Sequence, residues 1–101
     1  MILYAGYFKI IDKEKEKEIL QEHLDYVNNL LKAKIIFAKG PFTDKSGGLI
    51  IYHTNSLAEA TDYVMNDPVI LHASRSVEIK EWKSSINLQS VKPGDLPPNK
   101  F

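Results

Sequence analysis

The sequence predicts one α+β domain in which strands and helices follow each other in the order β-α-β-β-α-β. Three observations lead to this prediction: short apolar runs rich in β-branched and aromatic residues, two amphipathic segments between them, and a glycine-containing turn near the middle of the chain. This order favours an antiparallel sheet with both helices on one face, the ferredoxin-like split βαβ arrangement.

The central turn occupies residues 40–48, with the sequence G-P-F-T-D-K-S-G-G. The apolar runs 35–38 and 49–52 flank it and are too short for a stable helix, so both are predicted to be strands. Pro41 removes a hydrogen-bond donor, and Asp44 followed by two glycines is typical of a turn that needs positive φ angles. We therefore expect a β-hairpin with a wide, glycine-ended loop.

The first strand and the first helix come from the amino-terminal third of the chain. The apolar-aromatic run 2–11 predicts a central strand, and Asp12 is the expected N-cap of the helix that follows. The apolar stripe of this helix has the spacing i, i+4, i+7, i+11 and consists of Leu20, Leu24, Val27 and Leu31. His23 falls between Ile19 and Leu24 on the helix surface, so its titratable ring is expected to face the sheet.

The second half of the domain begins with a helix start signal. Ser56 followed by Glu59 is a capping box, and the pair Asp67-Pro68 ends the helix because the residue before proline is disfavoured in helical geometry. Asp67 is then the predicted N-cap of one further helical turn, with Pro68 in its first position. Residues 76–82 alternate with period two and predict the last strand.

With both helices on one face, the other face of the sheet is predicted to be bare. We expect Tyr7, Ile51, Val77 and their neighbours to form a large apolar patch there. Soluble monomers avoid such patches, so the sequence predicts a homodimer packed sheet against sheet, or a higher oligomer.

Composition narrows the possible classes of protein. The domain is expected to span residues 1–84, and the Pro-rich stretch 85–101 is expected to be an extended tail. The chain has 13 basic and 13 acidic residues and no cysteine, which argues against nucleic-acid binding and excludes disulfides and thiolate metal sites. No apolar run is long enough to cross a membrane and no signal peptide is visible, so we expect a cytoplasmic protein.

Several motifs occur together in an informative order. A histidine in the first helix is followed by a strand ending in Gly-Pro, a hairpin with Gly-Gly, Asp-Pro after the second helix, and E-I-K-E-W in the last strand. In this respect the sequence resembles the YciI-like (YCII-related) family over residues 2–82. The residues that carry the resemblance are His23, Gly40, Pro41, Asp44, Gly47, Gly48, Asp67, Pro68 and Trp82.

The resemblance implies a dimeric α+β barrel with one pocket per subunit, lined by the histidine and the aspartate that are its catalytic residues. Those positions are His23 and Asp67 here. Relatives include an enzyme that dehydrochlorinates an aromatic-ring compound, and muconolactone isomerases share the barrel. The remaining candidates, expected to contact the substrate, are Gly40, Pro41, Phe42, Asp44, Gly47, Gly48, Pro68 and Trp82.

The predicted chemistry is proton transfer. His23 would act as general acid-base, because its ordinary pKa lies near neutrality, and Asp67 would fix its tautomer and stabilise the imidazolium. Such a pair suits lyase, dehydrochlorinase or isomerase chemistry on a small polar ring compound, without a cofactor. No metal is expected either, because the spacing of His23, His53 and His72 matches no compact metal motif.

A different interpretation of the same residues remains open. His23 could be a hydrogen-bonded core histidine, and Asp67 could be a helix cap and nothing more. The chain would then be a non-catalytic protein that binds a small ligand or serves as a dimerisation accessory. Arg75 likewise could bind an anion near the pocket or be a surface charge at a strand end.

Overall fold

The computed structural model describes residues 1–85, which form four strands and three helices. In chain order the elements are β1 (Ile2–Ile10), α1 (Lys13–Lys32), β2 (Ile36–Pro41), β3 (Gly47–Tyr52), α2 (Leu57–Met65), α3 (Pro68–Leu71) and β4 (Arg75–Lys83). The predicted 85–101 tail, apart from Ser85, lies outside the described residues. Among the described residues, no helix is long and apolar enough to cross a membrane.

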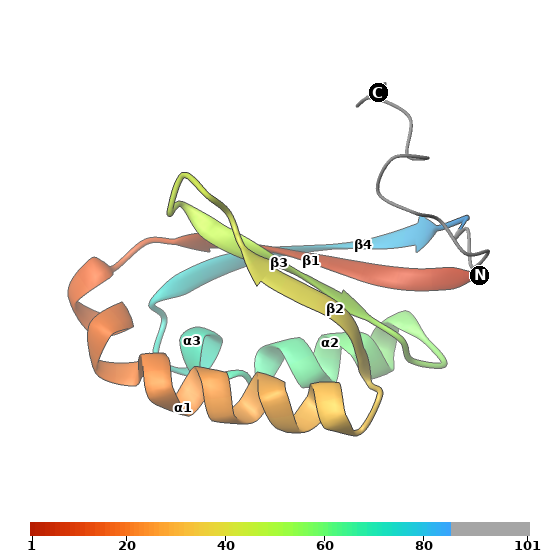
Figure 1. The fold of residues 1–101 in the computed structure, drawn as a ribbon, viewed down its shortest axis with the longest axis horizontal. Coiled ribbons are helices and arrows are strands. Elements are labelled where there is room, and N and C mark those ends of the chain that lie inside the picture. Colours follow the sequence, from red (N-terminus) through yellow and green to blue (C-terminus); the bar gives the residue numbers. More distant parts are fainter. Residues whose placement is uncertain (86–101) are drawn as a thin grey trace, which may run out of the picture.

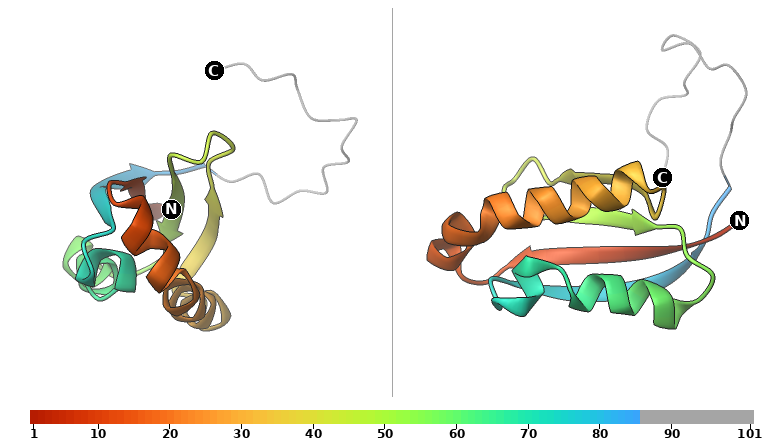
Figure 2. Two further views of the ribbon diagram at one scale, coloured as in Figure 1. Left: turned by 90° about the vertical axis from the view of Figure 1, so that its left-hand side faces the viewer. Right: turned by 90° about the horizontal axis from the view of Figure 1, so that it is seen from below.

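The strands form one antiparallel sheet in the order β2-β3-β1-β4. All three helices lie on the same side of this sheet, as Figure 1 and the end view in Figure 2 show. The predicted ferredoxin-like α+β arrangement is therefore confirmed, and it is the subunit fold of the dimeric α+β barrel proteins. The core lies between sheet and helices and consists of Tyr4, Phe8, Ile19, Val27, Ile36, Ile50, Tyr52, Ala60, Val64 and Val69.

The hairpin differs from the prediction in the role of its glycines. Gly47 and Gly48 belong to β3, and no glycine among the described residues has a positive φ; Lys45 has φ 63° instead. The reason for glycine at position 47 is close packing, because an added Cβ would lie 1.8 Å from the carbonyl oxygen of Phe8. The expectation of a wide, glycine-ended loop is thus wrong, and the ladder continues almost to the turn.

A carboxylate closes the short turn that remains. Oδ1 of Asp44 accepts hydrogen bonds from the backbone N–H of Ser46 (2.9 Å) and from its hydroxyl (2.6 Å). These bonds hold the pKa of Asp44 below its ordinary value, and the bond from the hydroxyl of Ser46 has the larger effect.

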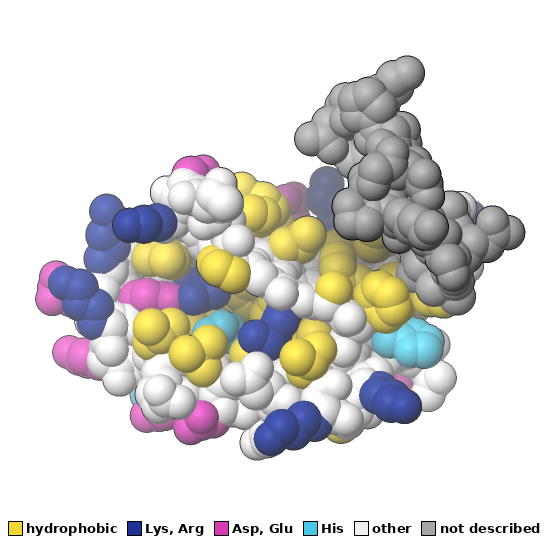
Figure 3. All heavy atoms as spheres, viewed as in Figure 1, with side chains coloured by type: hydrophobic (Ala, Val, Ile, Leu, Met, Phe, Trp, Pro, Cys, Tyr) yellow, Lys and Arg dark blue, Asp and Glu magenta, His cyan; other side chains and the backbone are white. Residues whose placement is uncertain are grey.

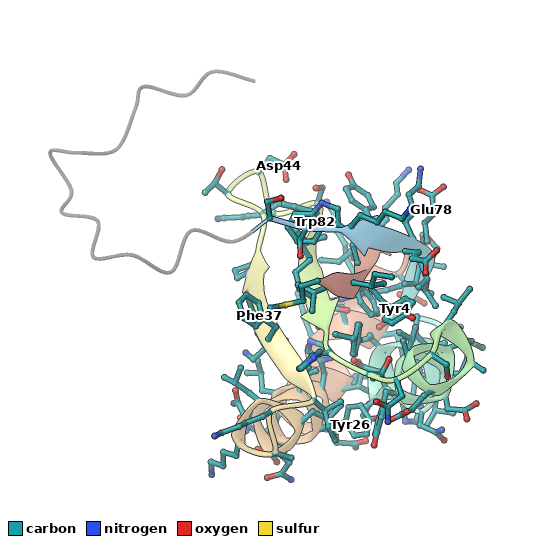
Figure 4. The ribbon with its side chains drawn as sticks, turned by 90° about the vertical axis from the view of Figure 1, so that its right-hand side faces the viewer. Tyr4, Tyr26, Phe37, Asp44, Glu78 and Trp82 are labelled. Atoms are coloured by element: carbon teal, nitrogen blue, oxygen red, sulfur yellow. The ribbon has the colours of Figure 1, made fainter. Side chains whose placement is uncertain are left out.

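A β-bulge in β2 controls which side chains face the helices. Ile36 pairs with Tyr52 but Ala38 pairs with Ile51, so Phe37 is an extra residue between the two pairs. A bulge of this kind reverses the alternation of side chains beyond it. Residue 39 therefore faces the helix side of the sheet, and Figure 4 shows Phe37 at the sheet edge.

The buried stripe of α1 is rotated from the predicted one. Its buried residues are Glu16, Ile19, His23 and Val27, whereas Leu20 and Leu31 are 42% and 41% exposed. The sequence pattern counted apolar residues and so excluded Glu16. In the structure Glu16 faces inward because it is bonded to Arg75 and Ser74.

The face of the sheet opposite the helices is uncovered among the described residues. Tyr7 pairs with Leu49, and Trp82 pairs with Leu3; Tyr7 is 49% and Trp82 46% exposed. Two details of the predicted patch need correction. Val77 pairs with Phe8 and packs against the core on the helix side, and Ile51 lies on the open face but is buried.

Candidate active site

His23 and Asp67 meet beneath the sheet although they are 44 residues apart in sequence. The short turn between α2 and α3 places Asp67 against α1, and its Oδ1 atom lies 2.7 Å from Nδ1 of His23. The same oxygen accepts a hydrogen bond from the backbone N–H of Val69 at 3.1 Å. Asp67 is therefore a helix cap, as predicted, and also the partner of the histidine ring.

This contact determines how the imidazole is presented. His23 is 6% exposed and Asp67 is fully buried, so water competes little for their bond. A carboxylate at Nδ1 favours the tautomer with a proton on that nitrogen, which leaves the lone pair on Nε2. Nε2 makes no hydrogen bond within residues 1–85. The ring can thus accept a proton at Nε2, and Asp67 then stabilises the imidazolium.

The ring of His23 forms part of the wall of a cavity of about 310 Å³ that is partly open to solvent. This volume lies at the small end of the range for ligand sites and suits a single ring with a few substituents. Figure 3 shows hydrophobic, basic and histidine side chains close together on this side of the molecule. The lining residues are Leu20, His23, Leu24, Lys39, Gly40, Pro41, Gly48, Leu49, Ile50 and Arg75.

Two tyrosines surround the buried carboxylate. Burial and the negative charge of Asp67 both raise the pKa of Tyr52, whose hydroxyl has no hydrogen-bond partner among the described residues. The pKa of Tyr26 is raised to about 12, by burial first and by the charge of Asp67 second. The Tyr26 hydroxyl donates to the carbonyl of Tyr63 at 2.7 Å. Both tyrosines are therefore neutral at physiological pH, and neither adds a charge to the pair formed by His23 and Asp67.

A second pair of charges lies at another part of the cavity wall. The guanidinium of Arg75 donates from Nε to Oε1 of Glu16 at 2.9 Å and also from Nη2, and the hydroxyl of Ser74 donates to Oε2 at 3.0 Å. Arg75 is therefore neither a free anion site nor a surface charge. It is a half-buried residue of the cavity wall, and its charge is compensated.

The structure brings together some of the predicted site residues but not others. Gly40, Pro41 and Gly48 line the cavity beside His23, and Asp67 lies behind the ring. The other predicted contacts do not line it: Phe42, Asp44, Gly47, Pro68 and Trp82. Phe42 packs on Tyr7 with ring centroids 5.1 Å apart, and Trp82 lies on the open face of the sheet, as Figure 4 shows.

Sequence reasoning did not single out the basic residue at position 39. In a regular strand Lys39 and Ile36 would face opposite sides of the sheet, and the bulge at Phe37 places them on the same side. No pattern in the sequence predicts that bulge.

Among residues 1–85, no group of three or more histidine, cysteine or acidic side chains could hold a metal ion.

Comparison with known proteins shows to which family the chain belongs. The model of the YCII-related domain matches residues 2–83. The chain belongs to the YCII-related family. The protein "Uncharacterized protein YjpA" from Bacillus subtilis (strain 168) is 33% identical over 67 residues, which cover 66% of this chain and 79% of that protein.

Two solved structures share the fold. The first is 5-chloro-2-hydroxyhydroquinone dehydrochlorinase (TftG) from Burkholderia phenoliruptrix AC1100, in complex with 2,5-dihydroxybenzoquinone. It matches with a TM-score of 0.70 and 25% identity, over 82% of this chain and 95% of that one. The second is a putative antibiotic biosynthesis monooxygenase from Deinococcus radiodurans, with a TM-score of 0.55 and 13% identity over 91% of this chain and 100% of that one. The second likeness concerns the fold alone.

Proposed function

We propose that this YCII-related protein is a small enzyme in which His23 and Asp67 perform acid-base chemistry on a small polar ring compound. The observation that carries the proposal is the 2.7 Å contact between Nδ1 and the buried carboxylate, with the same ring at the cavity wall. The likeness to a dehydrochlorinase supports chemistry of the lyase or isomerase type, with dehydrochlorination as one member of that class.

The reaction step follows from the geometry of the ring. Nε2 accepts a proton from a carbon or hydroxyl of the bound compound, and the resulting imidazolium is stabilised by Asp67 through Nδ1. In a dehydrochlorination the electron pair left on the ring compound expels chloride, so the products are a quinone-type ring, a proton and chloride. In an isomerisation the same Nε2 returns the proton to another atom of the ring.

The test is turnover of a defined compound by matched variants. Chloride release from 5-chloro-2-hydroxyhydroquinone is measured for the wild type, for His23→Gln and for His53→Gln, which changes an exposed histidine away from the cavity. Removal of a general acid-base should lower the rate by about a hundredfold or more, and His53→Gln should leave it unchanged. A His23→Gln variant with full activity would rule out the proposed role.

The non-catalytic interpretation remains the second candidate, because His23 is almost fully buried and could serve to hold a ligand without turning it over. The two candidates differ in one measurement. A wild type that binds ring compounds in the cavity, but converts no member of a panel of chlorinated and lactone compounds, would favour the binding protein.

We also propose that the protein is a homodimer formed through the open face of the sheet. Tyr7, Leu49 and Trp82 present apolar surface there without a covering layer among the described residues. Burial of such surface against a second copy is favourable at roughly 25 cal/mol per Å² of apolar area.

A further inference from the structure

Lys39 brings a positive charge to the cavity from an edge strand. The bulge at Phe37 turns its side chain to the helix-facing side of β2, in register with the core residue Ile50. Beyond the bulge the backbone of β2 also forms part of the wall through Gly40 and Pro41. The lysine is half-buried and is one of the residues that line the cavity.

The charge of Lys39 is not compensated within the described residues. Arg75 is paired with Glu16, and His23 with Asp67, but the ammonium of Lys39 has no carboxylate within ion-pair distance in residues 1–85. No aspartate or glutamate is among the lining residues of the cavity. The wall therefore carries an excess positive charge that a ligand can neutralise.

The rest of the wall determines what kind of anion fits. Leu20, Leu24 and Ile50 make most of the lining apolar, which suits the faces and edges of an organic ring. An ammonium group near such a surface interacts with an anion more strongly than it would in bulk water, because the local dielectric is lower. A ring that bears one anionic oxygen fits both parts of the wall, because the ring packs on the apolar residues and the oxygen pairs with the ammonium group.

We propose that Lys39 anchors the ligand by binding a ring-attached anionic oxygen, either a carboxylate or a phenolate or enolate, and so presents the ring to His23. The inference rests on the proposed function for the identity of the site and adds the substrate class, a small anionic ring compound. Lys39 also counters the negative charge that forms on the ring when His23 removes a proton.

The test compares anionic and neutral probes at neutral pH by isothermal titration calorimetry. The anionic probes are 2,5-dihydroxybenzoquinone, for the enolate case, and 4-hydroxybenzoate, for the carboxylate case; hydroquinone is the neutral probe. The variants are Lys39→Met, Lys39→Arg and, as a control, Lys32→Met, which removes an exposed lysine at the end of α1. Amide spectra by NMR establish that each variant is folded.

The expected result is a charge-dependent loss. Lys39→Met should weaken binding of at least one anionic probe by about tenfold or more and leave hydroquinone binding unchanged, whereas Lys39→Arg and Lys32→Met should bind as the wild type does. Equal affinities of the wild type and Lys39→Met for both anionic probes, or no binding of either by the wild type at millimolar concentration, would overturn the proposal. If Lys39→Met does not fold, the wild type decides: its affinity for the anionic probes must fall with added salt while that for hydroquinone does not.

The binding measurements, together with the chloride-release assay applied to the same variants, keep this inference separate from the enzymatic proposal. Lys39-dependent binding of an anion without any turnover would support the anchor and contradict the enzyme. Turnover that depends on His23 but is indifferent to Lys39→Met would support the enzyme and contradict the anchor.

Discussion

The two faces of the sheet carry different kinds of side chain. On the helix side the two buried carboxylates each have a partner: Asp67 binds His23, and Glu16 binds Arg75 and Ser74. On the open side, aromatic and aliphatic residues such as Tyr7 and Trp82 remain about half exposed. The helix side therefore holds the groups capable of chemistry, and the open side holds surface suited to association.

The difference shows why the two faces tolerate change differently. When one member of a buried polar pair is removed, the other is left without its partner, and the free energy of unfolding of the monomer decreases. An exposed apolar residue contributes little to the monomer, and the effect of replacing it depends on whether a second copy covers it. Four predictions test this contrast, beginning with the largest expected effect.

Asp67→Ala should destabilise the monomer by about 3 kcal/mol, because it leaves Nδ1 of His23 and the N–H of Val69 without their buried acceptor. The free energy of unfolding in urea measures the change. Asp67→Asn keeps the volume and one acceptor oxygen and should cost clearly less. Equal stabilities of the wild type and Asp67→Ala would mean that the helix side is not held by this pair.

Tyr7→Glu should disrupt the proposed dimer and raise its dissociation constant by about a hundredfold or more, since it places a charge at the centre of the open face. Sedimentation equilibrium measures the mass in solution. The control is Leu57→Glu, which changes an exposed apolar residue on α2, away from the open face. A wild type that sediments as a monomer would contradict the assembly role of this face.

Tyr26→Phe should cost about 1 kcal/mol, because the carbonyl of Tyr63 loses its donor. Its pH dependence has a definite sign. The pKa of Tyr26 is raised from 10.0 to about 12 by folding, so its contribution to stability is present below pH 10 and is lost as the pH rises through about 12. Thermal unfolding between these values should show the wild type losing its advantage over Tyr26→Phe.

Asp44→Asn tests the hairpin tip, outside both faces, and should have the smallest effect. The pKa of Asp44 is lowered in the folded protein by Ser46, so its contribution is present above the ordinary carboxylate pKa and disappears as the pH falls through the lowered value. Thermal unfolding of the wild type and the variant should differ slightly at neutral pH and converge in acid. A difference that grows in acid would contradict the assignment.

Much of the fold could be predicted because its signals are local. Ser56 and Asp67 cap helices through their own side chains, and both accept the expected backbone N–H groups, from Glu59 and Val69. The alternation in β4 correctly placed Val77 and Ile79 on a common face. Its local pattern could not say which face of the sheet the helices cover, so the assignment of Val77 to the open face failed.

The site could be predicted less completely, because its parts meet through tertiary contacts. The resemblance to the family named His23 and Asp67, and their contact across 44 residues depends on how the α2–α3 turn docks on α1. The inward position of Glu16 depends on Arg75, 59 residues away. Side chains with such distant partners carry no periodic signal of their own.

Local chemistry in the sequence thus specified the strands, the helix starts and the order of the elements, since caps, turns and periodicity act over a few residues. Tertiary structure decided which side chains share the cavity. A single extra residue at Phe37 turned Lys39 inward, and the docking of α3 placed a buried carboxylate behind His23. These outcomes depend on packing between segments far apart in the chain, where no local rule applies.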